Sequence, residues 1–366
     1  MHIKHIRWVL PALLMLALAG QGCTDQDEIY VGRAVMRPVE FRANGLVDVT
    51  VHGATPTRVG STTFETNDQL SIWAVRTDSV LSGGLLLSMP STFSDSSYYW
   101  TRNACYQVDA YGALTCISDN PVMQFDDSLM AMPMVYYVSY PYSSNRDSTF
   151  SFAVKADQSI SGNYTASDLA MQCVGPITAS TVNLTLQHKL TNIVVRLTGT
   201  DLTSKDITVE FLQVYLCVKA NQNTQTVVSG GTKLTCSRSD VTFGEDGTPT
   251  STQRQYHAIV APQTIADGKA LLRVTVDGDT LTGIARNTGN LRSGQQCMIQ
   301  LDISDMADGD NIYLNFGGDE SGGQDADVHS QTFEWYAWND DDNWNVPDKG
   351  HGDIGRTVWI TDGDWN

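Results

Sequence analysis

The stretch from Val182 to Leu197 constrains the fold most strongly, because apolar residues occupy alternate positions along most of it. A period of two residues is typical of a β-strand that buries one face. The phase of this alternation changes at Thr191-Asn192. The segment is therefore either one long strand with a bulge or two strands that meet at a bend.

The rest of the chain keeps the same short period. Almost no segment repeats its apolar residues every 3.6 positions for more than two turns, which disfavours a helical core. With 366 residues, of which 41% are hydrophobic, the chain is long enough for two domains. The alternation alone predicts an all-β fold, either a sandwich or a barrel. A polar link from Pro176 to Ser180 is the predicted domain boundary.

The charge balance excludes one class of partner. The chain has 23 Lys and Arg residues against 41 Asp and Glu residues, which gives a formal net charge of −18. Such an acidic surface offers no electrostatic footprint for nucleic acid or for an anionic membrane face. We therefore expect no nucleic-acid partner.

The N-terminus has the pattern of an export signal. Lys4 and Arg7 precede an apolar run from Trp8 to Gly20, which is too short to span a bilayer. A small residue then precedes Cys23 and acids follow it, as at a lipoprotein cleavage site, although the usual leucine three residues before the cysteine is missing. We expect residues 1–22 to be a signal peptide and Cys23 to carry the lipid that anchors the protein. The alternative is an ordinary secretory signal that is cut nearby.

The other cysteines suggest disulfides rather than a metal site. Cys105 and Cys116 flank one turn-like segment, and Cys217 and Cys236 flank another, so both pairs are candidate disulfides across hairpins. Cys217 could equally pack as a small hydrophobic residue in an apolar strand. No CxxC motif and no histidine at metal-ligand spacing accompanies these residues, so the sequence predicts no metal site.

Motifs for catalysis are absent from the sequence. It contains no G-x-S-x-G, H-E-x-x-H, P-loop or dinucleotide-binding pattern, so we assign no catalytic residue and no cofactor. Carboxylate pairs for glycoside hydrolysis are set by the fold rather than by spacing, and nothing nominates such a pair. His188 lies in the alternating stretch and is expected to be a structural residue. We expect a protein that is not an enzyme.

The tail from about residue 305 to Asn366 is rich in tryptophan and aspartate. Its tryptophans are Trp335, Trp338, Trp344, Trp359 and Trp365. Two functional interpretations are a tryptophan platform for a sugar and a calcium loop, but the D-x-[DN]-x-[DN]-G loop with a distal Glu is absent. We expect the tryptophans to pack against a sheet and the acids to solvate the loops.

Several motifs, taken in order, resemble the fimbrillin family, surface lipoproteins that build or cap type V pili. The matching segments are Val39 to Phe41, Thr57-Arg58, Phe64 to Ile72, Tyr137 to Tyr142, Asp168-Leu169, His188 to Ile193, Val260 to Gln263 and Leu291 to Ile303. The family has two transthyretin-like β-sandwich domains in series. The resemblance places them at residues 23–178 and 179–366, and the tail lies outside the family pattern.

The resemblance also implies a function. It predicts a lipid-anchored subunit on the outer membrane, at the cell surface, that serves as an anchor, tip or minor subunit of a pilus. In the family, an Arg-directed protease removes an N-terminal strand, and a strand of a neighbouring fimbrillin subunit fills the groove. Arg58 is the best candidate for this cut and Arg42 the next, because both follow the early strand and precede Phe64.

Two questions stay open at this point. An anchor subunit would not need the cut, and the ligand of an adhesive fibre could be a glycan or a protein of a host or bacterial surface. The rival hypothesis from another class is a surface glycan-binding lipoprotein, which the tryptophan-rich tail motivates.

Overall fold

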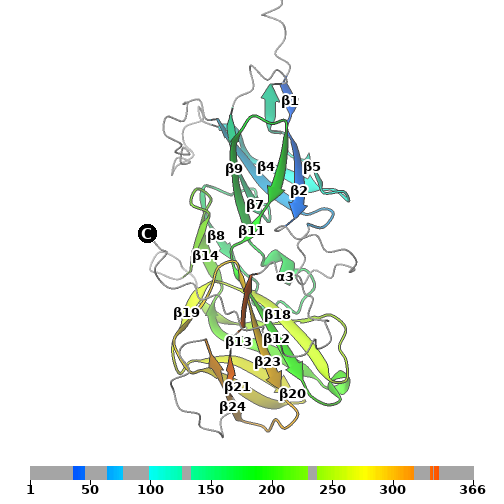
Figure 1. The fold of residues 1–366 in the computed structure, drawn as a ribbon, viewed down its shortest axis with the longest axis vertical. Coiled ribbons are helices and arrows are strands. Elements are labelled where there is room, and N and C mark those ends of the chain that lie inside the picture. The colour runs from blue at the N-terminus through cyan, green and yellow to red at the C-terminus, as the bar shows by residue number, and fades with distance from the viewer. Residues whose placement is uncertain are drawn as a thin grey trace, which may run out of the picture.

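The computed structural model describes residues 36–45, 64–76, 99–125, 133–229, 237–316, 330–332 and 334–337. Strands dominate these residues, and the helical elements among them are two short ones, α3 (Asn163–Ala166) and the 3-10 turn η1 (Leu202–Ser204). The predicted all-β fold is therefore confirmed. Figure 1 shows an elongated molecule in which two groups of strands follow one another along the long axis.

The first group is an eight-stranded sheet, which we call the N-terminal sheet. Its strands follow the order β10-β2-β5-β4-β3-β7-β9-β11, and all neighbours are antiparallel except β10 and β2. The bounds are β2 (Glu40–Gly45), β3 (Gln69–Arg76), β4 (Tyr99–Val108), β5 (Ala113–Cys116), β7 (Met134–Tyr140), β9 (Ala170–Ile177), β10 (Thr181–Thr185) and β11 (Gln187–His188). A short pair, β1 (Met36–Pro38) and β6 (Met123–Phe125), lies beside it.

One face of the N-terminal sheet encloses a hydrophobic core. Alternate residues of its strands meet there, among them Phe41, Tyr106 and Tyr136. The opposite face carries a smaller cluster that includes Trp73 and Tyr137. Because successive residues of a strand point to opposite faces, the neighbours Tyr136 and Tyr137 of β7 enter different cores. Both faces of β7 are therefore buried.

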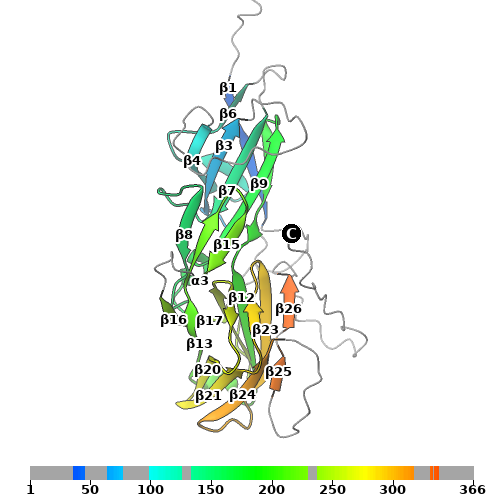
Figure 2. The ribbon, with the colours of Figure 1, turned by 90° about the vertical axis from the view of Figure 1, so that its left-hand side faces the viewer.

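The second group consists of two facing sheets, which we call the C-terminal sandwich. The sheet orders are β17-β18-β12-β23-β26 and β16-β13-β20-β21-β24-β25, and a separate hydrophobic core fills the space between them. Figure 2 shows the two layers edge-on in the lower half of the molecule. The bounds are β12 (Thr191–Thr198), β13 (Ile207–Tyr215), β16 (Arg238–Thr242), β17 (Gly244–Asp246), β18 (Gln253–Val260), β20 (Ala270–Val276), β21 (Asp279–Ala285), β23 (Gln295–Asp302), β24 (Asp310–Asn315), β25 (Ser330–Thr332) and β26 (Glu334–Ala337).

A third, smaller sheet connects the two groups. It pairs β8 (Thr149–Ala153), which precedes strand β9 of the N-terminal sheet, with β14 (Cys217–Asn221), which follows strand β13 of the sandwich. Strand β15 (Thr226–Ser229) adds to the other side of β14. Strands β19 (Gln263–Ile265) and β22 (Gly289–Leu291) form a further two-stranded pair.

The alternating stretch at residues 182–197 belongs to both groups. Its first part forms β10 and β11 in the N-terminal sheet, and its second part forms β12 in the middle of a sandwich sheet. The sequence left two alternatives, one long strand with a bulge or strands that meet at a bend, and the second is correct. The chain leaves the N-terminal sheet after His188, although the predicted boundary lies at residues 178–179. The domain limits stay a prediction.

The chain forms a tight hairpin at Asp277-Gly278. Strands β20 and β21 pair antiparallel across it, and both turn residues have positive φ angles, 52° and 103°. Glycine takes such angles without steric cost and aspartate tolerates them, which is the local reason why the chain reverses here.

Candidate functional site

Strand β2 occupies an interior position of the N-terminal sheet although it is the first strand of that sheet in the chain. It runs parallel to β10 and antiparallel to β5, and its pairing with β5 extends over two residues, Phe41 and Arg42. Its register with β10 breaks between Leu184 and Thr185. Residues 39–43 fill the position between β5 and β10, and we call this position the β2 slot (Figure 1).

The β2 slot is apolar and aromatic on its inner side. Phe41 is 1% exposed and lies edge-on to two tyrosine rings, with centroid distances of 5.2 Å to Tyr106 and 5.3 Å to Tyr136. Burial raises the pKa of both tyrosines, so each phenol stays neutral. The Tyr106 hydroxyl accepts a hydrogen bond from the Val122 amide at 2.8 Å. The Tyr136 hydroxyl, by contrast, is fully buried and has no hydrogen-bond partner among the described residues.

Backbone hydrogen bonds hold the residues of the β2 slot beyond the ladder itself. The amide of Val39 donates to the Val122 carbonyl at 2.9 Å, and the amide of Ala43 donates to the Gly112 carbonyl at 2.8 Å. Gly112 has a φ of 77°, and a Cβ atom there would lie 3.0 Å from the Ala43 carbonyl oxygen. Such backbone contacts are available to any extended segment, so selectivity in this slot must come from side chains.

The two predicted cleavage residues lie differently with respect to this slot. Arg42 is exposed but sits within β2, with its backbone opposite Ala113 on one side and Asn183 on the other. A protease could bind this segment only after β2 had left the sheet, because both backbone edges are already paired. Arg58 lies outside the described residues, in the connection between β2 and β3. A cut there would separate β2 from the rest of the sheet.

The structure brings together two motifs that the sequence analysis singled out separately. The His188 Nδ1 and the Asp168 Oδ1 atoms are 2.9 Å apart and both side chains are largely buried. Beside them, the Lys189 amide donates to the Leu169 carbonyl at 2.8 Å. Burial lowers the pKa of the Lys189 amine. His188 thus has a structural partner, at the point where the chain passes from one group of strands to the other.

A third hydrophobic cluster, which we call the junction core, surrounds this point. Its buried members are Val154, Leu169, Met171, Leu190, Val218, Ala220, Ile259 and Ala261. Strands of the N-terminal sheet, of the connecting sheet and of the sandwich all contribute to it. The two groups of strands therefore share apolar contacts and do not hang on a bare linker.

Polar contacts from the segment between β8 and β9 support the junction core. The Gln158 side chain pairs with the Ile259 backbone through two hydrogen bonds of 2.7 and 2.8 Å. The Tyr164 hydroxyl lies 3.2 Å from the Asn192 Oδ1 atom, and its ring packs against His257 at a centroid distance of 3.9 Å. Burial lowers the pKa of His257 to about 4, so this imidazole is neutral at pH 7. Sequence analysis missed these residues because no local pattern marks such long-range pairs.

The predicted disulfide between Cys105 and Cys116 is wrong, because both are free thiols. Cys116 lies opposite Tyr106, the residue after Cys105. Successive strand residues point to opposite faces, so the two thiols lie on opposite sides of the sheet. Cys217 is disulfide-bonded. Cys236, its predicted partner, lies outside the described residues, so this pairing stays a prediction.

The first part of the tail adds an edge strand to each sheet of the sandwich. Strand β25 pairs with β24, and β26 pairs with β23, where Trp335 lies opposite Cys297. The other tail tryptophans and the side chain of Trp335 lie outside the described residues, so the glycan-binding alternative stays a prediction. The Asp-Gly-Asp at 308–310 forms a turn in which Asp310 accepts a hydrogen bond from the Ala307 amide at 2.8 Å.

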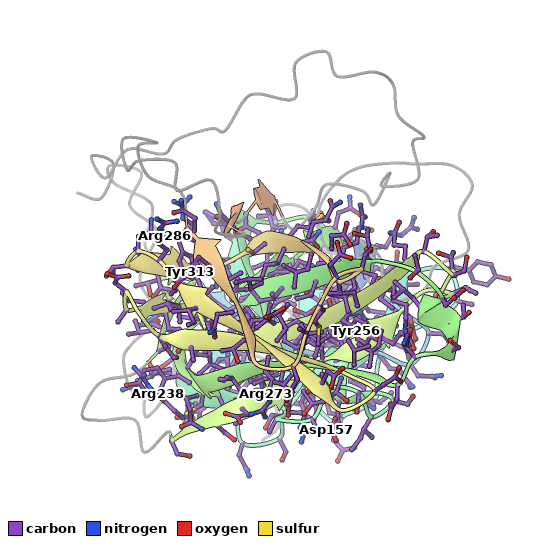
Figure 3. The ribbon with its side chains drawn as sticks, turned by 90° about the horizontal axis from the view of Figure 1, so that it is seen from below. Asp157, Arg238, Tyr256, Arg273, Arg286 and Tyr313 are labelled. Atoms are coloured by element: carbon purple, nitrogen blue, oxygen red, sulfur yellow. The ribbon has the colours of Figure 1, made fainter. Side chains whose placement is uncertain are left out.

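Charged side chains of the sandwich pair locally. The Arg273 Nη2 atom lies 2.6 Å from the Glu210 Oε2 atom, and the Arg286 guanidinium lies over the Tyr313 ring, 5.6 Å from its centroid, on the upper left of the molecule in Figure 3. Within the described ranges, no three His, Cys, Asp or Glu side chains gather as a metal site. No helix in the same ranges is both long and apolar enough to cross a membrane.

The comparisons with known proteins agree with the resemblance found in the sequence. Residues 57–315, more than half of the chain, match the family described as fimbrillin-like. The chain belongs to the fimbrillin-like family. This membership supports a structural subunit of a cell-surface fimbrium that associates with other subunits.

Solved structures share the fold of this fimbrillin-like chain. A candidate cell adhesion protein from Bacteroides ovatus is 16% identical, with a TM-score of 0.54 over 75% of this chain and 94% of that one. A candidate cell adhesion protein from Bacteroides uniformis is 14% identical, with a TM-score of 0.53 over 83% of this chain and 98% of that one. Among curated proteins, no sequence matches the chain.

Proposed function

We propose that the protein is a lipid-anchored anchor or tip subunit of a type V pilus, which joins its neighbours by exchange at the β2 slot and serves in adhesion. The observation that carries this proposal is the position of β2. It is a strand from the start of the chain, yet it lies between β5 and β10, which come from later segments. Its departure would leave two unpaired strand edges and an apolar cavity, both of which favour binding of another extended strand.

The connection after β2 supports a cut at Arg58. Described strands end at Gly45 on one side and resume at Gln69 on the other, and Arg58 lies between them. Cleavage there would free β2 without breaking any other strand of the sheet. Removal of β2 is still costly, because Phe41 and the preceding Val39 are buried, so the released strand would leave readily only when another strand replaces it.

The proposed location rests on the N-terminal sequence. A lipid on Cys23 would hold the subunit at the outer membrane. A permanently anchored subunit would keep this cysteine, whereas a polymerising subunit would lose it together with β2. The two roles therefore predict different mature N-termini.

Mass spectrometry of the protein from its own cell surface tests this proposal. Samples are prepared with and without an inhibitor of Arg-specific proteases. An acylated Cys23 in both samples identifies an anchor, and a chain that begins after Arg58 only without inhibitor identifies a polymerising subunit. An unmodified chain that begins near residue 23 in both samples, with no copy in isolated fimbriae, would contradict the proposal.

A further inference from the structure

One side chain, Phe41, defines the strand that fills the β2 slot more than any other. Phe41 alone among the β2 residues inserts an aromatic ring into the core, where it contacts two other rings at nearly perpendicular angles of 76° and 83°. Edge-to-face contacts of this kind favour an aromatic ring over an aliphatic side chain of similar size. The residue after it, Arg42, is exposed.

The ring contacts come from two different strands that would both stay in the sheet when β2 leaves. Tyr106 belongs to β4 and Tyr136 to β7. The Tyr106 ring is fixed by its hydrogen bond from Val122, and the Tyr136 ring is fully buried. The cavity left by Phe41 would therefore keep two aromatic walls at defined positions.

The Tyr136 hydroxyl gives an independent sign that β2 does not satisfy this cavity completely. A buried hydroxyl without a hydrogen-bond partner destabilises a fold, because it has lost its water without replacement. Among the described residues nothing bonds it while Phe41 fills the slot. A different strand in the slot could bring a group that forms a hydrogen bond with this hydroxyl.

From these contacts we propose that the β2 slot selects its strand by an aromatic side chain at the position of Phe41. The partner is an extended segment of another subunit with the pattern apolar-x-aromatic-x-small, as in Val39, which directly precedes β2, and in Phe41 and Ala43 of β2. This inference rests on the proposed function, because it names the strand that the exchange would accept. Backbone pairing supplies the generic part of the affinity, and the ring between Tyr106 and Tyr136 supplies the selectivity.

The test measures which peptides replace β2. A site for a sequence-specific protease is inserted between residues 45 and 64 of the full chain, and the chain is cut so that β2 stays in place without a covalent link. Labelled peptides of residues 36–45 then compete for the slot, as the natural sequence and as the variants Phe41→Leu, Phe41→Ala and Arg42→Ala. Fluorescence anisotropy gives the dissociation constant of each.

We expect the Phe41→Ala peptide to bind at least about 100-fold more weakly than the natural one, because a buried ring is lost. Binding of the Phe41→Leu peptide should weaken about 10-fold. The Arg42→Ala control should stay within about threefold, because that side chain is exposed. In the cut protein, the substitution Tyr136→Leu should bring the dissociation constants of the natural peptide and the Phe41→Leu peptide closer together. Equal binding of the Phe and Leu peptides would overturn the inference.

Light scattering of the cut protein, read in parallel, separates this inference from the proposed function. Selective peptide binding without multimers contradicts strand exchange between subunits and leaves the selectivity intact. Multimers with no preference among peptides contradict the selectivity alone, and a slot that admits no peptide contradicts both. If the cut chain unfolds, thermal melting of uncut chains with the same substitutions tests the aromatic preference instead. Equal Tm values for the Phe41→Leu variant and the natural chain would overturn it.

Discussion

Strands β2 and β12 are both interior strands with an apolar inner face, yet they are held very differently. Strand β12 pairs with β18 and with β23 along all of its residues, from Thr191 to Thr198. Strand β2 pairs with β5 at two residues and with β10 across a break in register. The alternation of apolar residues is therefore compatible with a permanent strand and with a replaceable one. The length of the paired segments on the two sides distinguishes the two.

The largest effect should come from a charge placed in the permanent strand. The change Val195→Asp puts a carboxylate into the fully buried core of the sandwich, with no partner for it. We expect a loss of roughly 4 kcal/mol or more in the free energy of unfolding. The same new charge at the exposed Arg42 position of β2, in the variant Arg42→Asp, should cost less than about 0.5 kcal/mol. Urea denaturation measures both, and similar losses would remove the contrast between the strands.

The next effect concerns the junction and depends on pH. The pKa of His257 is lowered to about 4 in the folded protein, whereas its ordinary value is 6.5. Between these values the unfolded chain binds a proton that the folded chain excludes, so stability is complete above pH 6.5 and falls as the pH approaches 4. The total loss is about 3 kcal/mol.

Urea denaturation at pH 7, 5.5 and 4 measures this loss against the variant His257→Gln. Carboxylates titrate in both proteins, so the difference between the two pH profiles isolates the histidine. The Tyr164 ring packs against His257, Gly244 lies opposite it in the neighbouring strand, and the Nδ1 atom of His257 is buried with no hydrogen-bond partner among the described residues. Parallel pH profiles for the two proteins would show that His257 binds a proton as readily in the folded chain as in the unfolded one.

The buried pair at the junction should give a smaller effect. The change Asp168→Asn removes the charge that faces His188 while it keeps the size of the side chain. We expect a loss of about 1–3 kcal/mol at pH 6. The exposed control Asp201→Asn should change stability by less than about 0.5 kcal/mol. Calorimetry should show the loss in the unfolding transition, and an unchanged transition would place the junction outside the cooperative structure.

The smallest effects concern the walls of the β2 slot and have opposite signs. The change Tyr136→Phe removes the hydroxyl that has no partner and should raise the free energy of unfolding by about 1 kcal/mol. The change Tyr106→Phe removes the acceptor of the Val122 amide and should lower it by about 1 kcal/mol. Chemical denaturation of the two variants compares them directly. A loss in both would mean that the Tyr136 hydroxyl is bonded.

Much of the fold was accessible from the sequence, because alternation of apolar residues is a local pattern. It predicts the strands at residues 182–197, and the turn residues Asp277-Gly278 are a local reason for the hairpin between β20 and β21. What alternation does not contain is the choice of neighbour. The parallel pairing of β2 with β10 joins residues about 140 positions apart, counted from Phe41 and Val182, and no spacing within either strand encodes it.

The candidate site was only partly accessible for the same reason. The sequence singled out Asp168 and His188 through separate motifs but gave no sign that they form a pair. It marked Phe41 as apolar without marking the two tyrosines that surround it. The wrong prediction for Cys105 and Cys116 shows the limit most clearly, because one residue of register decides whether two side chains share a face.

Hydrogen exchange of the intact chain tests the difference between β2 and β12 most directly. The amides of β12 should exchange only through global unfolding, because both edges of that strand are paired along its length. The amides of β2 should exchange through a smaller opening, at least about 100-fold faster at pH 7 and 25 °C. Equal protection of the two strands would contradict the account, because β2 would then be as permanent a part of the fold as β12.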